Sequence, residues 1–185
     1  MKYLEVEQKF QVDDLEVLED CLADLGAKAG PSTRQIDTYY NPPHRDFLAA
    51  DVISEWLRIR EENGGSSINY KRWLPLEAKI KTHCDEYETA VVDSEAIRRL
   101  LHALDFREIV TVDKTRQEWT VGSEIVVAFD TVVGAGRFVE FEFKGEATDV
   151  QETITRLEQF VRDLAVPLGN RINRGYPHML LGREH

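Results

Sequence analysis

Cysteine, long apolar runs and positive charge are all scarce in this chain of 185 residues. Its two cysteines, Cys21 and Cys84, are too few for a disulfide framework, and no CxxC or Cys/His spacing typical of a zinc site occurs. No stretch approaches the roughly 18 consecutive apolar residues of a transmembrane helix. The first ten residues also lack the apolar core of a signal peptide. These absences predict a soluble, cytoplasmic protein that does not enter a membrane.

Acidic side chains outnumber basic ones, 34 against 23, which gives a net charge of −11. Proteins that coat nucleic acid or bind anionic membranes need a surplus of Lys and Arg, so neither partner is expected. A small anionic ligand is still compatible, because a local basic pocket can lie inside an acidic protein. At this length, 42% hydrophobic residues are enough for one core, and we expect a single domain over residues 1–185.

Three segments have the apolar period of amphipathic helices, beginning near Asp13, Ser94 and Asp149. Between them, eight segments alternate with period two, which is typical of half-buried strands. Together they predict an α+β fold with a large antiparallel sheet or barrel. The expected strands are Tyr3–Phe10, Gln35–Tyr40, Glu55–Glu61, Ser67–Trp73, Glu86–Val92, Val110–Thr120, Ile125–Asp130 and Arg137–Lys144.

Charged residues gather on one face of these strands, because successive side chains point to opposite sides. In any single strand this describes an ordinary amphipathic sheet with its charges in water. The three helices, however, must bury their own apolar faces, and the apolar strand faces can receive them. If the helices cover the outside of a closed sheet, the charges line a hollow interior. The residues in question are Glu5, Glu7, Lys9, Arg58, Arg60, Lys71, Glu86, Glu88, Lys114, Arg116, Asp130, Glu140 and Glu142.

The chemistry of such an interior follows from its side chains. Clustered carboxylates without His or Cys form an all-oxygen site that suits Mg²⁺ or Mn²⁺ better than zinc. Lys and Arg from several strands suit a polyanion with more charge than one phosphate. A divalent cation together with basic residues is the combination that phosphoryl-transfer enzymes use.

The segment Glu5-Val6-Glu7-Gln8-Lys9 matches the ExExK signature of the CYTH domain. The chain resembles this family, the triphosphate tunnel metalloenzymes, over nearly its whole length. The family includes class IV adenylyl cyclases, thiamine triphosphatases and inorganic tripolyphosphatases. Further segments resemble the family in the same order: Gln35–Tyr40, Leu57–Arg60, Asn69–Lys71, Glu86–Glu88, Asp113–Arg116, Phe129–Asp130 and Gly136–Glu142.

The resemblance implies an eight-stranded antiparallel β-barrel, or tunnel, with amphipathic helices packed on its outside. It implies a metal held by Glu5, Glu7, Glu140 and Glu142, with Asp130 a further candidate. Lys9, Lys71 and Tyr40 are the candidates for catalysis, and Glu86 and Glu88 form an acidic strand whose role is open. The residues expected to grip the triphosphate are Lys9, Arg58, Arg60, Lys71, Lys114, Arg116 and Arg174.

Two stretches depart from the family pattern. The C-terminal segment Arg174–Leu181 keeps the tyrosine and the leucines of a closing motif but inserts Gly175 and Pro177. The stretch Trp73–Asp85 is longer than a tight hairpin needs and is a candidate for a lip that controls access.

Three functions fit this set of basic residues and metal ligands. Cyclisation of ATP and hydrolysis of a triphosphate both use such a set and differ in the nucleophile, which is either the ribose 3′-hydroxyl or water. The segment Val127–Glu142 resembles the class IV adenylyl cyclase branch, so cyclisation to cyclic AMP and pyrophosphate is the first hypothesis. A triphosphatase acting on tripolyphosphate, thiamine triphosphate or a nucleotide is the alternative. A module that binds polyphosphate or nucleotide without turnover is the third, and the oligomeric state is open, with a homodimer as one expectation.

Overall fold

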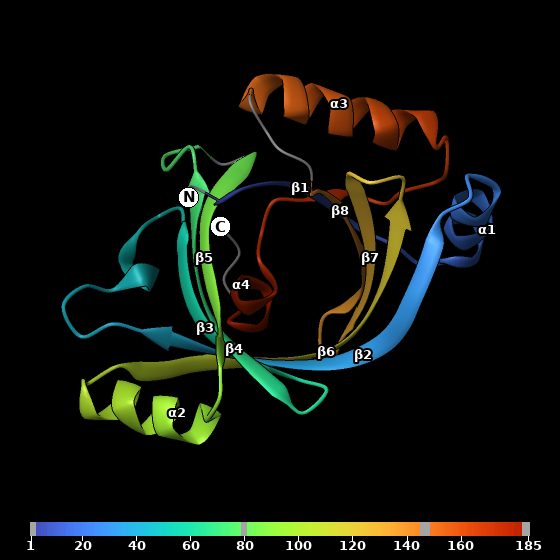
Figure 1. Cartoon of the computed structure of the whole chain (residues 1–185). Coiled ribbons are helices and arrows are strands. Elements are labelled where there is room, and N and C mark those ends of the chain that lie inside the picture. Colours follow the sequence, from blue (N-terminus) through green and yellow to red (C-terminus); the bar gives the residue numbers. More distant parts are fainter. Residues whose placement is uncertain (1–2, 79–80, 145–148, 183–185) are drawn as a thin grey trace.

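The chain folds into a closed β-barrel surrounded by helices (Figure 1). The computed structural model describes residues 3–78, 81–144 and 149–182, with side chains from Val6 onward. In chain order the elements are β1 (Tyr3–Gln11), α1 (Glu16–Asp24), β2 (Lys28–Asn41), the short 3₁₀ helix η1 (Phe47–Ala49), β3 (Glu55–Glu62), β4 (Gly65–Leu74), β5 (His83–Val91), α2 (Ser94–Ala103), β6 (Arg107–Val121), β7 (Ile125–Val132), β8 (Gly136–Phe143), α3 (Val150–Asp163), β9 (Arg171–Ile172) and α4 (Tyr176–Leu180).

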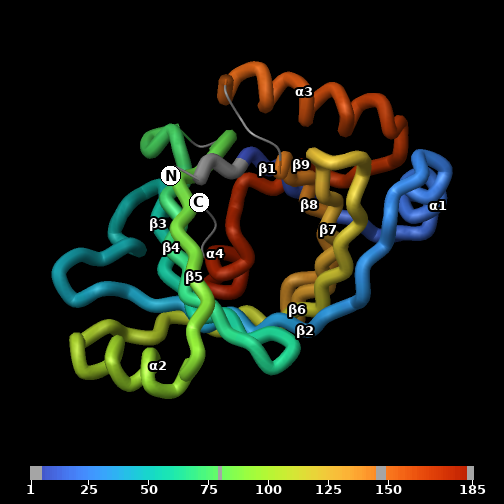
Figure 2. Tube along the Cα trace, in the orientation of Figure 1, coloured from blue at the N-terminus to red at the C-terminus, as the bar shows by residue number. Residues whose placement is uncertain are grey.

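Eight antiparallel strands close the barrel in the order β5-β4-β3-β2-β6-β7-β8-β1. Closure comes from β1, whose first residues pair with β5 from Tyr3↔Glu86 to Val6↔His83. The short β9 pairs with β1 farther along, at Lys9 and Phe10 (Figure 2). The predicted eight-stranded antiparallel barrel is therefore confirmed.

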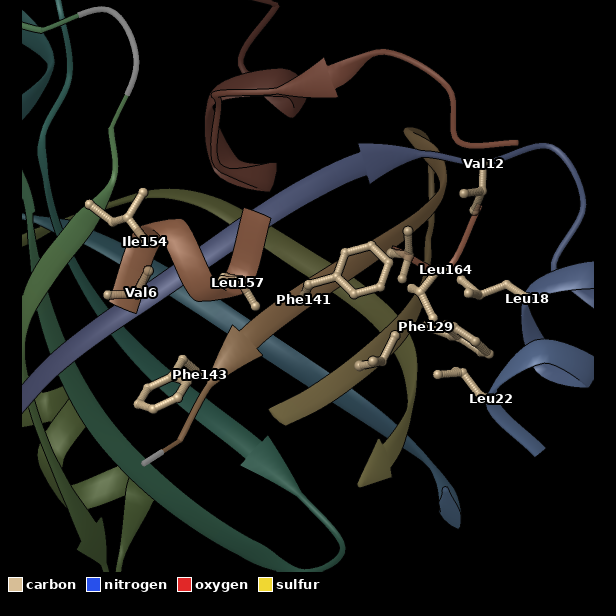
Figure 3. Close-up of a cluster of buried hydrophobic side chains, with 12 residues drawn as sticks. Val6, Val12, Leu18, Leu22, Phe129, Phe141, Phe143, Ile154, Leu157 and Leu164 are labelled. Carbon is tan, nitrogen blue, oxygen red and sulfur yellow. The ribbon is translucent and has the colours of Figure 1, made fainter. Parts of the chain in front are cut away.

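The main core lies between the outer wall of the barrel and helices α1 and α3 (Figure 3). Strands β1, β7 and β8 turn their apolar faces outward, and the helices cover them with their own apolar sides. Each large side chain buried in this way stabilises the fold by about 1.5–3 kcal/mol. The buried members of this cluster are Val6, Val12, Leu18, Leu22, Val127, Phe129, Val139, Phe141, Phe143, Ile154, Leu157 and Leu164.

Helix α2 covers a separate, smaller core on another part of the wall. Its Leu101 packs with Tyr40 of β2 and Ile59 of β3. In Figure 1 this helix lies outside the ring, as α1 and α3 do. The expected arrangement, with apolar strand faces outside under helices and charged faces inside, is thus confirmed.

The helix starts follow local capping chemistry. Asp149 caps α3 by accepting hydrogen bonds from the backbone N–H groups of Gln151 and Glu152, at 2.8 and 3.0 Å. Helix α1 begins at Glu16, with Leu15 at the N-cap position and no side-chain cap, and Asp14 accepts a hydrogen bond from the Glu16 N–H at 2.9 Å just before it. The predicted start near Asp13 is therefore a few residues too early.

The sequence patterns did not predict β9 or α4, which follow α3. Pro177 occupies the first turn of α4, where a missing N–H costs nothing. Tyr176 joins an apolar layer that occupies part of the barrel interior, with Tyr39, Trp56, Val112 and other buried residues. This C-terminal segment therefore contributes to the interior rather than to the outer wall.

The connection from β4 to β5 contains most of the predicted lip, Trp73–Asp85. Its residues 79–80 lie outside the described residues, so the lip stays a prediction. None of the helices within the described ranges is long and apolar enough to cross a membrane.

Candidate active site

A cavity of about 330 Å³ lies inside the barrel. Strand alternation brings polar and charged side chains to it from many strands, while the apolar side chains of the same strands face the helices. Its lining residues are Glu7, Lys9, Gln35, Tyr39, Trp56, Arg58, Arg60, Glu62, Ser67, Asn69, Lys71, Trp73, Glu86, Glu88, Lys114, Arg116, Glu118, Glu140, Glu142, Lys144, Gly175, Tyr176 and Pro177. We call this cavity the tunnel.

One group of cations in the tunnel is organised by Asp37. Arg60 donates to its two carboxylate oxygens at 2.7 and 2.8 Å, and Arg58 donates at 3.2 Å. Burial alone would raise the pKa of Asp37, but the charges of Arg58 and Arg60 hold that pKa well below its usual range. The carboxylate therefore stays ionised and fixes both guanidinium groups.

Asp37 is not among the site residues predicted from the sequence. Its role follows from strand register, because Asp37 lies opposite Arg60 across the β2–β3 ladder and on the same face. A carboxylate directly opposite an arginine in adjacent strands is a common cross-strand ion pair. The assignment needed the pairing of these two strands, which the sequence pattern did not specify.

A second group of cations is organised by Asp130, which has no exposed surface. It accepts hydrogen bonds from Arg116 Nε at 2.7 Å, from Lys114 at 3.2 Å and from the Tyr176 hydroxyl at 2.7 Å. These donors contact both oxygens of Asp130, so in the structure the carboxylate is a counter-ion that holds two cations in place. Its metal-ligand role stays a prediction.

Glu140 connects this second group to β1. Lys9 lies 2.9 Å from one Glu140 oxygen, and Arg116 pairs with the other. The Lys9 ammonium also lies 4.0 Å from the ring centre of Tyr176. Burial and the nearby Arg116 lower the pKa of Lys114 to about 7, so this group carries less charge than an exposed lysine.

Glu7 and Glu142 line the tunnel as direct partners across the β1–β8 ladder. Glu140 projects from the same face two residues before Glu142, and Lys144 pairs with Glu142. Glu5 lies in β1, and its side chain is outside the described part of the structure. Among the side chains that are described, no three carboxylate, His or Cys groups form a ready-made metal cluster.

The remaining predicted residues of the tunnel lie on β4 and β5. Lys71 lies 3.4 Å from Glu86, which also accepts a hydrogen bond from Asn69 at 2.6 Å. Glu88 accepts from Ser67 at 2.8 Å. The acidic strand therefore contacts polar and basic groups of the neighbouring strand inside the tunnel.

Tyr40 does not lie in the tunnel, so its predicted catalytic position is wrong. Its hydroxyl donates to Glu108 and accepts from Arg98, each at 3.1 Å, beneath helix α2. The neighbouring Tyr39 lines the tunnel instead and packs edge-on against Trp56. Adjacent residues of a strand point to opposite faces, so only one of the two tyrosines can face inward.

Arg174 takes a different position from the other predicted phosphate ligands. Its backbone oxygen accepts a hydrogen bond from Lys9 at 3.4 Å. Arg174 lines a smaller cavity beside the tunnel. The structure therefore brings Lys9, Arg58, Arg60, Lys71, Lys114 and Arg116 together in one cavity and places Arg174 at its side.

Comparisons with known proteins agree with this architecture. A Methanocaldococcus jannaschii protein provisionally named as an adenylate cyclase is 30% identical over 174 residues, which are 94% of this chain and 96% of its own. Adenylate cyclase CyaB of Aeromonas hydrophila is 25% identical over 166 residues, which are 89% of this chain and 80% of its own. A solved structure from Pyrococcus horikoshii superimposes with a TM-score of 0.78 at 29% identity, over 97% of this chain and 99% of its own. The model of the CYTH domain matches residues 3–176, and the chain therefore belongs to the CYTH domain family.

Proposed function

We propose that the protein binds a linear triphosphate in the tunnel and acts on it together with a divalent metal ion, Mg²⁺ or Mn²⁺. The observation that carries the proposal is the convergence of six cationic side chains from four strands on one cavity. A single phosphate could engage only part of this set, whereas a chain of phosphates can contact both groups of cations. Charge-assisted contacts of this kind are short and strong.

The two counter-ions, Asp37 and Asp130, hold the phosphate-binding cations in place before the substrate binds. Each holds a pair of cations through hydrogen bonds, so the cations are already positioned when the substrate enters. Preorganised donors avoid the cost of rearrangement during the reaction. Arg58, Arg60 and Arg116 would neutralise charge on the phosphate oxygens as the transferred group leaves.

The metal would be held by the tunnel carboxylates of β1 and β8. Glu7 and Glu142 project from opposed positions with Glu140 beside them, and carboxylate oxygens are the ligands that Mg²⁺ and Mn²⁺ prefer. We keep Glu5 in this set on the resemblance alone. A divalent ion bound there would supply charge neutralisation at the phosphate oxygens. Metal binding would compete with the ion pairs Lys9–Glu140 and Lys144–Glu142.

Cyclisation of ATP to cyclic AMP and pyrophosphate is the reaction that we place first. Its support is the relationship to two proteins named as adenylate cyclases. Hydrolysis of a triphosphate is the alternative, because the cations contact phosphates whatever group the phosphate chain carries. The third hypothesis, binding without turnover, is less favoured, since Glu7, Glu140 and Glu142 would add nothing to an anion-binding module.

The test is to incubate the protein with Mg²⁺ or Mn²⁺ and either ATP or inorganic tripolyphosphate, and to separate the products by chromatography. Cyclic AMP with pyrophosphate establishes the cyclase. Phosphate released from either substrate without cyclic AMP establishes the triphosphatase. Absence of turnover with both substrates, and with thiamine triphosphate in the same assay, would overturn the catalytic proposal and leave the binding module.

A further inference from the structure

The β3–β4 hairpin carries three of the six cations proposed to bind phosphate, Arg58 and Arg60 on β3 and Lys71 on β4. A tight turn joins the two strands at one end of the hairpin. The other end is open, where β3 begins at Glu55 and β4 ends at Leu74. The position of this open end matters most for Lys71, because Lys71 lies within the last four residues of β4.

A lysine from the connection between β4 and β5 ties this open end together. The ammonium of Lys81 donates a hydrogen bond to Ser54 Oγ at 2.8 Å. It also donates to the backbone oxygens of Pro75 and Leu76, at 2.8 and 2.5 Å. A lysine ammonium has three N–H groups, so each of them has an acceptor here. Because Ser54 directly precedes β3 and Pro75 directly follows β4, Lys81 links the two strand ends.

Ser54 extends this link to Trp73, near the end of β4. The backbone oxygen of Ser54 accepts a hydrogen bond from the Trp73 N–H at 2.7 Å. The Ser54 hydroxyl also lies 3.1 Å from the backbone oxygen of Val52 and 3.2 Å from that of Leu76. Ser54 is buried, and a buried polar group that loses its partner is costly. The contacts of Lys81 therefore fix the backbone at Trp73 as well.

Trp73 and Lys71 share the tunnel face of β4, because they are two residues apart along the strand. The Lys71 ammonium lies 5.7 Å from the centre of the Trp73 ring and 3.4 Å from Glu86. The other two cations of the hairpin are held by Asp37 of β2. Of the three, Lys71 is therefore the one whose position depends on the open end of the hairpin.

Lys81 does not itself face the phosphate-binding cavity. Among the described residues it lines the smaller cavity beside the tunnel and not the tunnel itself. Burial lowers the pKa of its ammonium, and the negative charge of Glu77 opposes that shift. The ammonium contacts neutral oxygens of the protein, so any effect of Lys81 on phosphate binding is indirect.

We propose that Lys81 is a positioning residue for triphosphate binding. Its ammonium fixes the open end of the β3–β4 hairpin, and through Ser54 and Trp73 this places the Lys71 ammonium in the tunnel. The proposal rests on the function proposed above, because the position of Lys71 matters only if the tunnel receives phosphates. It adds to that function a residue outside the tunnel that sets the affinity for the phosphate chain.

The first test is the variant Lys81→Met, which keeps an unbranched apolar side chain and removes the three N–H donors. Binding of tripolyphosphate is measured by calorimetry in EDTA, which prevents metal-dependent turnover. Lys81→Met should weaken this binding about five- to tenfold, because Lys71 is displaced but not removed. Lys28→Met makes the same change at an exposed lysine of β2 and should leave the affinity unchanged.

Double variants test the route through Lys71. If Lys81 acts through Lys71, then Lys81→Met combined with Lys71→Ala should bind tripolyphosphate as Lys71→Ala does alone, because the contact that Lys81 positions is already lost. In combination with Arg60→Ala the two losses should multiply, since Asp37 holds Arg60 independently of Lys81. Losses that multiply in both combinations would overturn the proposed route.

A small amine separates positioning from a general loss of stability. Lys81→Ala leaves space for a propylammonium ion, which carries the same N–H donors as the missing side chain. Propylammonium should restore most of the tripolyphosphate affinity that Lys81→Ala loses, and it should leave the wild-type affinity unchanged. Tetramethylammonium has the same charge but no N–H donor, so it should restore none. Equal effects of the two ions would contradict the proposal.

Melting curves of the free proteins complete the test. A lower melting temperature of Lys81→Met with unchanged tripolyphosphate affinity would show a purely structural role and overturn the proposal. If Lys81→Met does not fold, Ser54→Ala tests the same link: it should weaken binding about two- to threefold, and an unchanged affinity would refute the link. If wild type does not bind tripolyphosphate, the proposed function itself fails, and the role of Lys81 fails with it.

Discussion

The hydroxyl of Tyr176 donates a 2.7 Å hydrogen bond to the fully buried carboxylate of Asp130. The ring of the same tyrosine lies 4.0 Å from the Lys9 ammonium and 5.0 Å from that of Lys114. Helix α4, which is only five residues long, therefore contacts two of the proposed phosphate ligands and the counter-ion Asp130 through one side chain. Tyr176 is thus a positioning residue for the basic side of the tunnel.

The variant Tyr176→Phe removes the hydroxyl and keeps the ring, so it tests the contribution of the hydroxyl alone. Loss of the hydrogen bond to Asp130 is expected to lower the free energy of unfolding by about 1 kcal/mol, since Arg116 and Lys114 still satisfy the carboxylate. Tyr176→Leu also removes the aromatic face beside the two lysines, and the KM for the triphosphate should rise further. Urea unfolding and steady-state kinetics measure both effects. Tyr87→Phe, at an exposed tyrosine, is the control, and equal KM values for all of these variants would contradict the positioning role.

Glu7→Gln and Glu142→Gln should each abolish metal-dependent turnover and leave the fold intact. The amide keeps the size of the side chain but removes the negative charge that a divalent cation requires. Turnover is measured over a range of Mg²⁺ and Mn²⁺ concentrations, and folding by circular dichroism. Glu95→Gln, in an exposed pair with Arg99 on α2, should retain wild-type activity. Full activity of either tunnel variant would refute its assignment as a metal ligand.

Arg58→Ala should weaken triphosphate binding about 10- to 100-fold, because it removes a charge-assisted contact worth roughly 1.5–3 kcal/mol. Binding of monophosphate should weaken much less, since a single phosphate cannot occupy both groups of cations at once. Calorimetry with tripolyphosphate and with inorganic phosphate gives the two affinities. Arg99→Ala removes a positive charge from the surface and serves as the control. A similar loss for both ligands would indicate a general anion surface.

Asp37→Asn should destabilise the protein and change its response to acid. The variant leaves Arg58 and Arg60 largely buried without their shared counter-ion, and breaking such a contact costs about 3 kcal/mol or more. The pKa of Asp37 is lower in the folded state than in the unfolded chain. Its stabilising contribution is therefore complete above about pH 4 and declines as the pH falls toward the folded value.

Urea unfolding at several pH values between 7 and 3 measures this contribution. The difference in stability between wild type and Asp37→Asn should be largest near neutral pH and should shrink below about pH 4. A difference that is constant over this range would show that Asp37 does not supply an ionised carboxylate to the two arginines.

The sequence alone determined which side chains share a face. Period-two alternation is a local property, so Arg58 with Arg60, and Lys114 with Arg116, could be grouped without knowing any strand partner. The apolar period of the three helices predicted that they cover the opposite faces. These patterns predicted a large antiparallel sheet or barrel with charged faces inside, and the resemblance to the CYTH family specified the eight-stranded closed form that the structure has.

Tertiary structure decided which charges meet. Asp37 faces Arg60 because β2 pairs with β3 in one register, and Asp130 meets Tyr176 across 46 residues of sequence. The choice between Tyr39 and Tyr40 had the same origin, since the two residues alternate and only the closed sheet defines which face is inside. Closure has the same dependence, since β5 and β9 pair with different parts of β1. Alternation along a strand depends on neighbouring residues, whereas register and closure depend on contacts between distant ones, and these contacts positioned the counter-ions Asp37 and Asp130.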